Sequence, residues 1–109
     1  MLTVANLGDS ICTLVRKDRS WQKLSSDHST SRPDEKERVL RSHGTIIRGK
    51  VQGELAVTRA FGNRELKDII ISKPEISRQI ISPADDFLIL SSDGLFRSYT
   101  QDYVIERIW

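Results

Sequence analysis

Two aspartates at expected sharp bends are the residues of this sequence best suited to chemistry. Asp9 lies within Gly-Asp-Ser at residues 8–10, directly after the apolar run 2–7. Asp93 lies within Ser-Asp-Gly at 92–94, after the apolar run 87–90. Two strand ends that face each other can hold Mg²⁺ or Mn²⁺ between such carboxylates, because these ions prefer oxygen ligands. Asp and Gly are also ordinary turn residues, so either motif alone favours a plain turn.

Composition describes a small soluble globular chain. Its 109 residues are 38% hydrophobic and 29% charged, which fits at most one domain with one modest core. The formal charge is +2, with ten Lys and Arg against six Asp and Glu in the first 53 residues and seven against nine in the remainder. This asymmetry is too weak to indicate a nucleic-acid partner, which usually leaves a strongly basic stripe.

A single cysteine, Cys12, excludes an internal disulfide and favours a reducing compartment, the cytoplasm or the nucleus. Cys12 lies in an apolar stretch with no neighbouring His or basic group, which predicts a buried structural thiol rather than a nucleophile. No apolar run approaches the length of a membrane span, and the first residues do not resemble a signal peptide.

The elements that would position the two aspartates are mainly short strands. Apolar runs predict a strand buried on both faces at 2–7, a returning strand at 11–16 and a third strand at 21–24 after a polar turn. A further buried strand is expected at 87–90, just before Asp93. The hairpin-length connections favour an antiparallel α+β arrangement over a parallel sheet.

Two helices are expected between and after these strands. Pro33 fits a first helical position, acidic residues follow it, and the helix should run to about Ser42 and stop at Gly44. Thr100 can cap a second helix that ends the chain. Of the two histidines, His28 is expected in a surface loop and His43 at the surface end of the first helix, because His is more often exposed than fully buried.

Taken together, five blocks resemble the metal-dependent protein serine/threonine phosphatases of type 2C, the PPM-type family. Any one block is weak, but five in the right order over nearly the whole chain are not expected by chance. The blocks are VANLGDS at 4–10, LSSDH at 24–28 with RPDEKER at 32–38, GELAVTRAFG at 53–62, KPEI at 73–76, and FLILSSDGLF at 87–96.

The resemblance implies a portion of an α-β-β-α sandwich of two antiparallel sheets flanked by helices. It also implies hydrolysis of phosphoserine and phosphothreonine in a phosphoprotein substrate, with two Mg²⁺ or Mn²⁺ ions per complete domain activating a water. By the resemblance, Asp93 corresponds to a carboxylate ligand of the metal pair. Asp9 corresponds to an acid lining a weaker third metal position. No partner membrane or nucleic acid is implied, and the oligomeric state is not indicated.

Residues 1–109 are expected to be an incomplete domain, its central to C-terminal part. The family's Asp-Gly-His-Gly-like motif, with its catalytic histidine and bridging carboxylate, does not occur in the sequence, nor does the last Asp-Asn metal ligand. No catalytic residue is therefore retained. One remaining ligand of the metal pair predicts no appreciable activity for this chain, and the alternative is a catalytically dead, phosphatase-like protein-binding module.

Two positions depart from the family pattern. Arg97 stands where an acid normally helps to hold the third metal, and a cation there should repel the ion. A guanidinium at this position can instead contact a substrate phosphate, but loss of the third metal is favoured because it requires no new geometry. Asn63 stands where the family usually has Asp, at a position expected to be structural.

Overall fold

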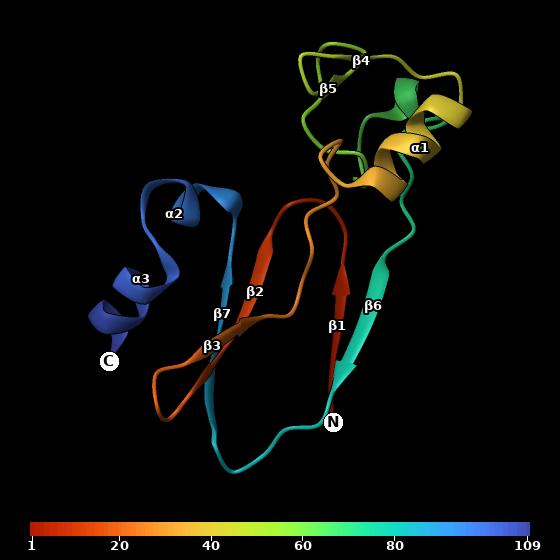
Figure 1. The fold of residues 1–109 in the computed structure, drawn as a ribbon. Helices are drawn as coiled ribbons and strands as arrows, with labels where there is room; N and C mark the ends of the chain where they lie inside the picture. The colour runs from red at the N-terminus through yellow and green to blue at the C-terminus, as the bar shows by residue number, and fades with distance from the viewer. The chain divides into compact units, whose positions relative to one another are not determined.

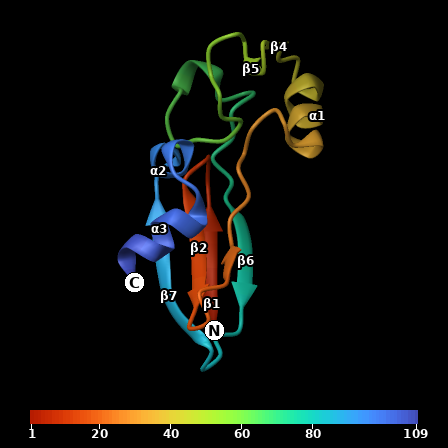
Figure 2. The same ribbon diagram turned by 60° about the vertical axis from the view of Figure 1, so that its left-hand side comes forward.

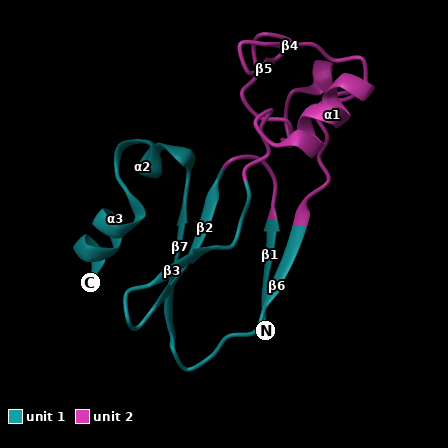
Figure 3. Ribbon diagram, viewed as in Figure 1, with its two compact units in different colours: residues 1–5, 10–26, 76–109 teal, residues 6–9, 27–75 magenta.

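The computed structural model describes all of residues 1–109, which form two compact units. Unit 1 comprises residues 1–5, 10–26 and 76–109, and unit 2 comprises residues 6–9 and 27–75 (Figure 3). Each unit is built from segments that are distant in sequence. Each also has a hydrophobic cluster of its own.

Strand β2 (Ile11–Arg16) is the centre of the main sheet of unit 1 (Figure 1). It pairs antiparallel with β3 (Trp21–Lys23) on one side and with β7 (Asp85–Ser91) on the other. The β2–β3 connection is a tight turn in which the Asp18 carboxylate accepts a hydrogen bond from the Ser20 amide at 2.9 Å. This side-chain turn is the kind that Asp favours, and it fixes the hairpin register.

A second, two-stranded sheet pairs β1 (Leu2–Asn6) with β6 (Glu75–Gln79). The two strands run in opposite directions in both Figure 1 and Figure 2, so this pair is antiparallel as well. The prediction that residues 2–7 are buried on both faces was wrong. Thr3 and Ala5 are exposed while Leu2 and Val4 are partly buried, because only one side of β1 is covered.

Helices α2 (Asp93–Ser98) and α3 (Gln101–Ile108) pack on one face of the main sheet. The cluster between them contains Val15 and Ile89 from the sheet and Val104 and Ile105 from α3. Thr100 caps α3 as expected, since its hydroxyl accepts a hydrogen bond from a backbone amide of the first turn. The expected helix is therefore confirmed, and α2 is an additional helix that the sequence pattern did not indicate.

Strand β7 has apolar side chains on both of its faces, but only one face is covered. Phe87 and Ile89 face α3, whereas Leu88 and Leu90 point to the opposite face and are 39% and 75% exposed. The prediction of a fully buried strand at 87–90 was wrong, because successive side chains alternate between faces and this chain covers one face of β7. β2, by contrast, is buried on both faces.

Unit 2 is organised around helix α1 (Pro33–Arg41) and the small hairpin of β4 (Ile46–Ile47) and β5 (Lys50–Val51). A 3₁₀ turn, η1 (Arg64–Leu66), completes its regular structure. Its core consists of Val39, Val51, Ile69 and Ile70.

Helix α1 begins at Pro33 as predicted and ends just before Gly44. His43 is exposed and has a left-handed backbone with φ of 65°, which turns the chain out of the helix. A Cβ on Gly44 would lie 2.9 Å from both Val39 Cγ1 and Val39 O. Glycine is therefore required at position 44 by the close approach of the chain to the helix, and not by its backbone angle.

The predicted α+β class with antiparallel sheets is confirmed by these pairings. Cys12 is buried as expected, and burial raises the pKa of its thiol, so it is a poor nucleophile. None of the helices has the length and hydropathy that crossing a membrane requires.

Candidate functional site

Asp93 is the first residue of α2, directly after β7, and its carboxylate is 40% exposed. The expected sharp bend at Gly94 was wrong, because the chain enters a helix there instead. Ser92 occupies the N-cap position, and Asp93 lies at the positive end of the helix dipole, where a carboxylate is favoured. One turn later, Arg97 forms an ion pair with the Asp93 carboxylate.

Asp9 lies in unit 2 and follows a turn that only glycine adopts readily. Gly8 has φ of 104°, and a Cβ added to it would approach Arg59 O to 3.4 Å. The turn predicted at residues 8–10 is therefore confirmed. Asp9 itself is partly buried. Because Asp9 and Asp93 belong to different units, their common role as metal ligands stays a prediction.

The donors in this chain do not by themselves fit a divalent metal ion. No three His, Cys, Asp or Glu side chains are grouped in a way that would hold one. The carboxylate of Asp93 is already neutralised by Arg97, whose guanidinium is a fixed positive charge. A bound dication would have to displace that guanidinium and find further oxygen ligands from outside these residues.

His28 is the side chain whose position differs most from expectation. The prediction of a surface histidine was wrong, because its side chain is fully buried. Its Nδ1 accepts a hydrogen bond from the Gly8 amide at 3.0 Å, and its own amide donates to Gly8 O at the same distance. His28 O accepts the Thr58 amide at 2.9 Å. These bonds satisfy Nδ1 and both backbone groups of His28, whereas Nε2 has no hydrogen-bond partner.

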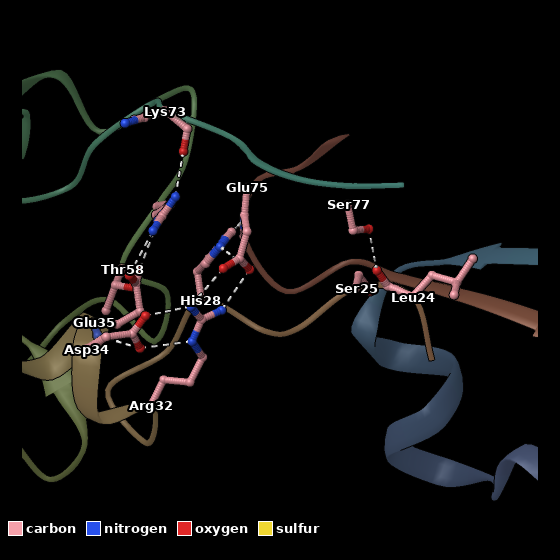
Figure 4. Close-up of polar contacts among 12 residues, drawn as sticks. Leu24, Ser25, His28, Arg32, Asp34, Glu35, Thr58, Lys73, Glu75 and Ser77 are labelled. Atoms are coloured by element: carbon pink, nitrogen blue, oxygen red, sulfur yellow. Dashed lines mark hydrogen bonds and ion pairs between the residues drawn. The ribbon is translucent and has the colours of Figure 1, made fainter. Parts of the chain in front are cut away.

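The other ring nitrogen of His28 faces Glu75. Nε2 lies 3.4 Å from Glu75 Oε1. Arg32 donates two hydrogen bonds, of 2.9 and 3.0 Å, to the same carboxylate. Figure 4 shows His28, Arg32 and Glu75 meeting in this way. Burial lowers the pKa of His28, the charge of Arg59 lowers it further, and Glu35 and Glu75 oppose these effects in part. His28 is therefore held in its neutral form.

Arg32 is also bound to Asp34 at the start of α1, through hydrogen bonds of 3.0 and 2.7 Å. These bonds lower the pKa of Asp34 to about 2. Two carboxylates occupy the two hydrogen-bonding edges of its guanidinium, so Arg32 has no free edge with which to bind a phosphate. The Arg32 side chain therefore links the start of α1 to the start of β6.

Glu35 is the centre of a buried ionic cluster that the sequence analysis missed. The side chain is 2% exposed and accepts two hydrogen bonds from Arg59, at 2.9 and 3.0 Å, one from Thr58 Oγ1 at 2.7 Å and one from Arg38 at 3.1 Å. Burial alone would raise the pKa of Glu35, but these four bonds prevail and lower it to about 2. The carboxylate is thus a structural anion and not a general acid.

A sequence signal for this cluster did exist. Glu35 is four residues before Val39, the only buried apolar residue of α1, so the two share one face of the helix. Periodicity alone could therefore have placed Glu35 against the core. Its partner Arg59 is 24 positions away, and no local pattern indicates that pair.

Comparison with known proteins identifies the relatives of this chain. The family model described as "Protein phosphatase 2C" matches residues 1–108. This chain belongs to the protein phosphatase 2C family. Among curated members, probable protein phosphatase 2C 78 of Arabidopsis thaliana is 44% identical over 98 residues, and probable protein phosphatase 2C 60 of the same species is 35% identical over 116.

Solved structures agree with the assignment to protein phosphatase 2C. A structure described as a C. elegans sex determining protein matches with a TM-score of 0.86 and 29% identity, over 94% of this chain and 26% of that one. Serine-threonine phosphatase 2C from Toxoplasma gondii matches with a TM-score of 0.82 and 25% identity, over 95% of this chain and 41% of that one.

The matched region is a minor part of each relative. The chain is covered to 87% and 98% by the two Arabidopsis thaliana proteins, but it spans only 24% and 32% of their lengths. The protein phosphatase 2C relatives thus contain much that these 109 residues do not. The fold and the family are shown by the comparison, while the activity of a whole protein requires a separate argument.

Proposed function

We propose that residues 1–109 are part of a metal-dependent protein serine/threonine phosphatase domain and that the 109-residue chain alone has no appreciable activity. The family match over residues 1–108 is the observation that carries the proposal. Asp93 directly follows the end of β7 in the main sheet, and a strand end is a suitable place for a metal ligand. In the complete domain, two Mg²⁺ or Mn²⁺ ions would supply an activated water for attack on phosphoserine or phosphothreonine.

The lack of activity follows from the donor set. Asp93 and Asp9 are the only residues that correspond to the family's metal-binding positions, and neither belongs to a cluster of three possible ligands. Two hydrated dications require several carboxylates each to be held firmly. We infer that the remaining ligands come from segments outside these 109 residues.

Phosphatase assays of two polypeptides test this proposal. The 109-residue chain, given millimolar Mn²⁺ and a phosphothreonine peptide, should show no turnover above the rate with Mn²⁺ alone. The product of the complete reading frame should turn the peptide over and lose that activity in Asp93→Ala. Turnover by the short chain that disappears in Asp93→Ala would contradict the first part. An active complete product that is unaffected by Asp93→Ala would contradict the assignment of Asp93.

Arg97 supports a second proposal, a weakened third metal position. Its guanidinium pairs with Asp93 and stands where an acid would support the ion, so it opposes a cation electrostatically. In the complete product, Arg97→Asp should increase the number or affinity of bound Mn²⁺ ions in a calorimetric titration. Unchanged Mn²⁺ binding together with a raised KM for the phosphopeptide would instead favour a contact between Arg97 and substrate phosphate.

The alternative function is a phosphatase-like protein-binding module without catalysis. The internal Asp93–Arg97 pair favours it, because a carboxylate that already has a cationic partner needs no metal. Such a module would bind a protein partner and would not bind Mn²⁺ tightly. Tight Mn²⁺ binding by the complete product would exclude it.

The location in the cytoplasm or nucleus also stays a prediction and rests on the single, buried Cys12.

A further inference from the structure

His28 forms hydrogen bonds with both backbone polar groups of Gly8, in the turn that carries Asp9. The Gly8 amide donates to His28 Nδ1, and Gly8 O accepts from the His28 amide, each at 3.0 Å. The ring is fully buried, so water cannot replace either bond. Gly8 is itself buried and, as a glycine, has no side chain of its own to hold it. The imidazole therefore supplies a buried side-chain contact to this turn.

The other ring nitrogen of His28, Nε2, lies beside the charged carboxylate of Glu75. A neutral histidine whose Nδ1 accepts a hydrogen bond must carry its proton on Nε2. Nε2 lies 3.4 Å from Glu75 Oε1 without forming a hydrogen bond to it, and Arg32 fixes the Glu75 carboxylate from the N-terminal end of α1. The Gly8 amide thus sets the tautomer of the ring, and the fixed Glu75 carboxylate lies beside the protonated nitrogen.

We propose that His28 is a positioning residue for Asp9: its Nε2–H tautomer accepts the Gly8 amide at Nδ1 and thereby fixes the direction of the neighbouring carboxylate. The importance of that direction for metal binding rests on the proposed function. The hydrogen-bonded positioning itself does not. His28 has no direct contact with a reacting group in this scheme and acts only through the turn.

Two isosteric substitutions separate the roles of the two ring nitrogens. The side-chain oxygen of Asn takes the place of Nδ1, so His28→Asn keeps an acceptor for the Gly8 amide. The amide nitrogen of Gln takes the place of Nε2, so His28→Gln keeps a donor towards Glu75 but loses the acceptor. His43→Gln is the matched control, because His43 is an exposed histidine at the end of α1.

Amide hydrogen exchange of Gly8 is the primary measurement, with Gly44 as the reference amide in the same unit, since it donates to Val39 O at 2.9 Å. His28→Gln should accelerate Gly8 exchange roughly tenfold while Gly44 changes little, because one buried hydrogen bond is lost locally. His28→Asn should restore slow exchange, and His43→Gln should change neither amide. Unchanged Gly8 exchange in His28→Gln, or equal acceleration of Gly44, would overturn the proposal.

A measurement on the unsubstituted protein covers the case in which a variant does not fold. Nitrogen-15 NMR should show an unprotonated Nδ1, a protonated Nε2 and a scalar coupling across the hydrogen bond from the Gly8 nitrogen to Nδ1. A protonated Nδ1 would overturn the proposal.

Mn²⁺ titration of the complete product then distinguishes this inference from the proposed function. Weaker binding in His28→Gln, restored in His28→Asn, supports both. If Gly8 exchange responds as expected and Mn²⁺ affinity does not, the positioning contact stands and the metal role of Asp9 is refuted.

Discussion

Unit 1 and unit 2 are stabilised by different kinds of contact. The first has an apolar cluster, in which α3 covers one face of the main sheet while Leu88 and Leu90 lie exposed on the other. The second adds to its apolar cluster a buried ionic one centred on Glu35. One carboxylate in each unit shows the difference. Glu35 accepts four hydrogen bonds and is shielded from water, whereas Asp93 has one exposed partner, Arg97.

This contrast indicates which carboxylates are available for chemistry. Replacing the donors of Glu35 would leave buried charges without partners, so its geometry is fixed by the fold. Asp93 can exchange Arg97 for another cation at little energetic cost, because an exposed ion pair is weak. A buried, fully satisfied acid is structural, and an exposed acid at a strand end is the one that a ligand can recruit.

Glu35→Gln should have the largest effect on stability. It leaves the partly buried Arg59 and Arg38 without their buried negative partner, which typically costs about 3–5 kcal/mol. Both tryptophans are in unit 1, so the loss should be followed through unit 2 amides such as that of Gly44 during urea unfolding. Glu37→Gln, which disrupts only the exposed pair with Arg41, should change stability by less than about 1 kcal/mol. Similar losses in both variants would contradict the special role of the buried cluster.

Ile89→Ala and Leu90→Ala test the two faces of β7 in unit 1. Ile89 is 8% exposed and packs against α3, so its truncation should cost about 2–5 kcal/mol. Leu90 is 75% exposed, and its truncation should cost less than about 1 kcal/mol. Tryptophan fluorescence during denaturation measures both, since Trp109 lies 5.5 Å from Phe87 between ring centroids. Equal costs would mean that the exposed face is covered in solution.

Acid should destabilise unit 2 through Glu35. Its pKa is about 2 when folded and 4.5 for the ordinary side chain, so the stability it contributes is present above pH 4.5 and is lost as pH falls towards 2. The loss amounts to up to roughly 3 kcal/mol. His28 acts in the same direction at higher pH, because its lowered pKa makes the unfolded chain bind the proton first as pH falls below about 6.5.

Unit 2 amide exchange measured between pH 5 and pH 3 isolates the Glu35 contribution, after correction for the intrinsic pH dependence of exchange. The unsubstituted protein should lose protection across this range, and Glu35→Gln should show a much flatter response. An equally steep response in the variant would assign the acid sensitivity to other carboxylates.

Arg97→Ala should have the smallest effect. Its pair with Asp93 is exposed and lies within one short helix, so its removal should change the unfolding free energy by less than about 1 kcal/mol. Fluorescence-detected urea unfolding is a suitable measurement, with Arg107→Ala on α3 as a charge-matched control. A loss above 2 kcal/mol would show that the pair is structural and would weaken the case for Asp93 as a metal ligand.

Much of the secondary structure could be predicted because its causes are local. Asp18 turns the hairpin through its own side chain, Pro33 begins α1, and Thr100 caps α3. Short-range signals of this kind need only a few neighbouring residues. Asn63 is similar, since it takes the left-handed backbone that Asn tolerates, with φ of 60°.

The unpredicted features depend on partners that are distant in sequence. His28 reads as a surface loop residue until Gly8, 20 positions earlier, is seen to donate to its ring. The bend expected at Gly94 became α2, in which Leu95 and Phe96 pack against the apolar cluster of the sheet. Which face of β7 is buried also depends on α3, and alternation in the strand sets the period without choosing the covered side.

The sequence by itself determined the family, the order of the main strands and of helices α1 and α3, and the presence of carboxylates after two apolar strands. Periodicity, caps and ordered sequence blocks are properties of the chain alone. Only the tertiary structure decided that His28 and Glu35 are buried, that Arg97 is the partner of Asp93, and that one face of β7 stays open. The reason is physical: burial and ion pairing are free energies of contact, and a residue acquires its contacts only when distant segments pack together.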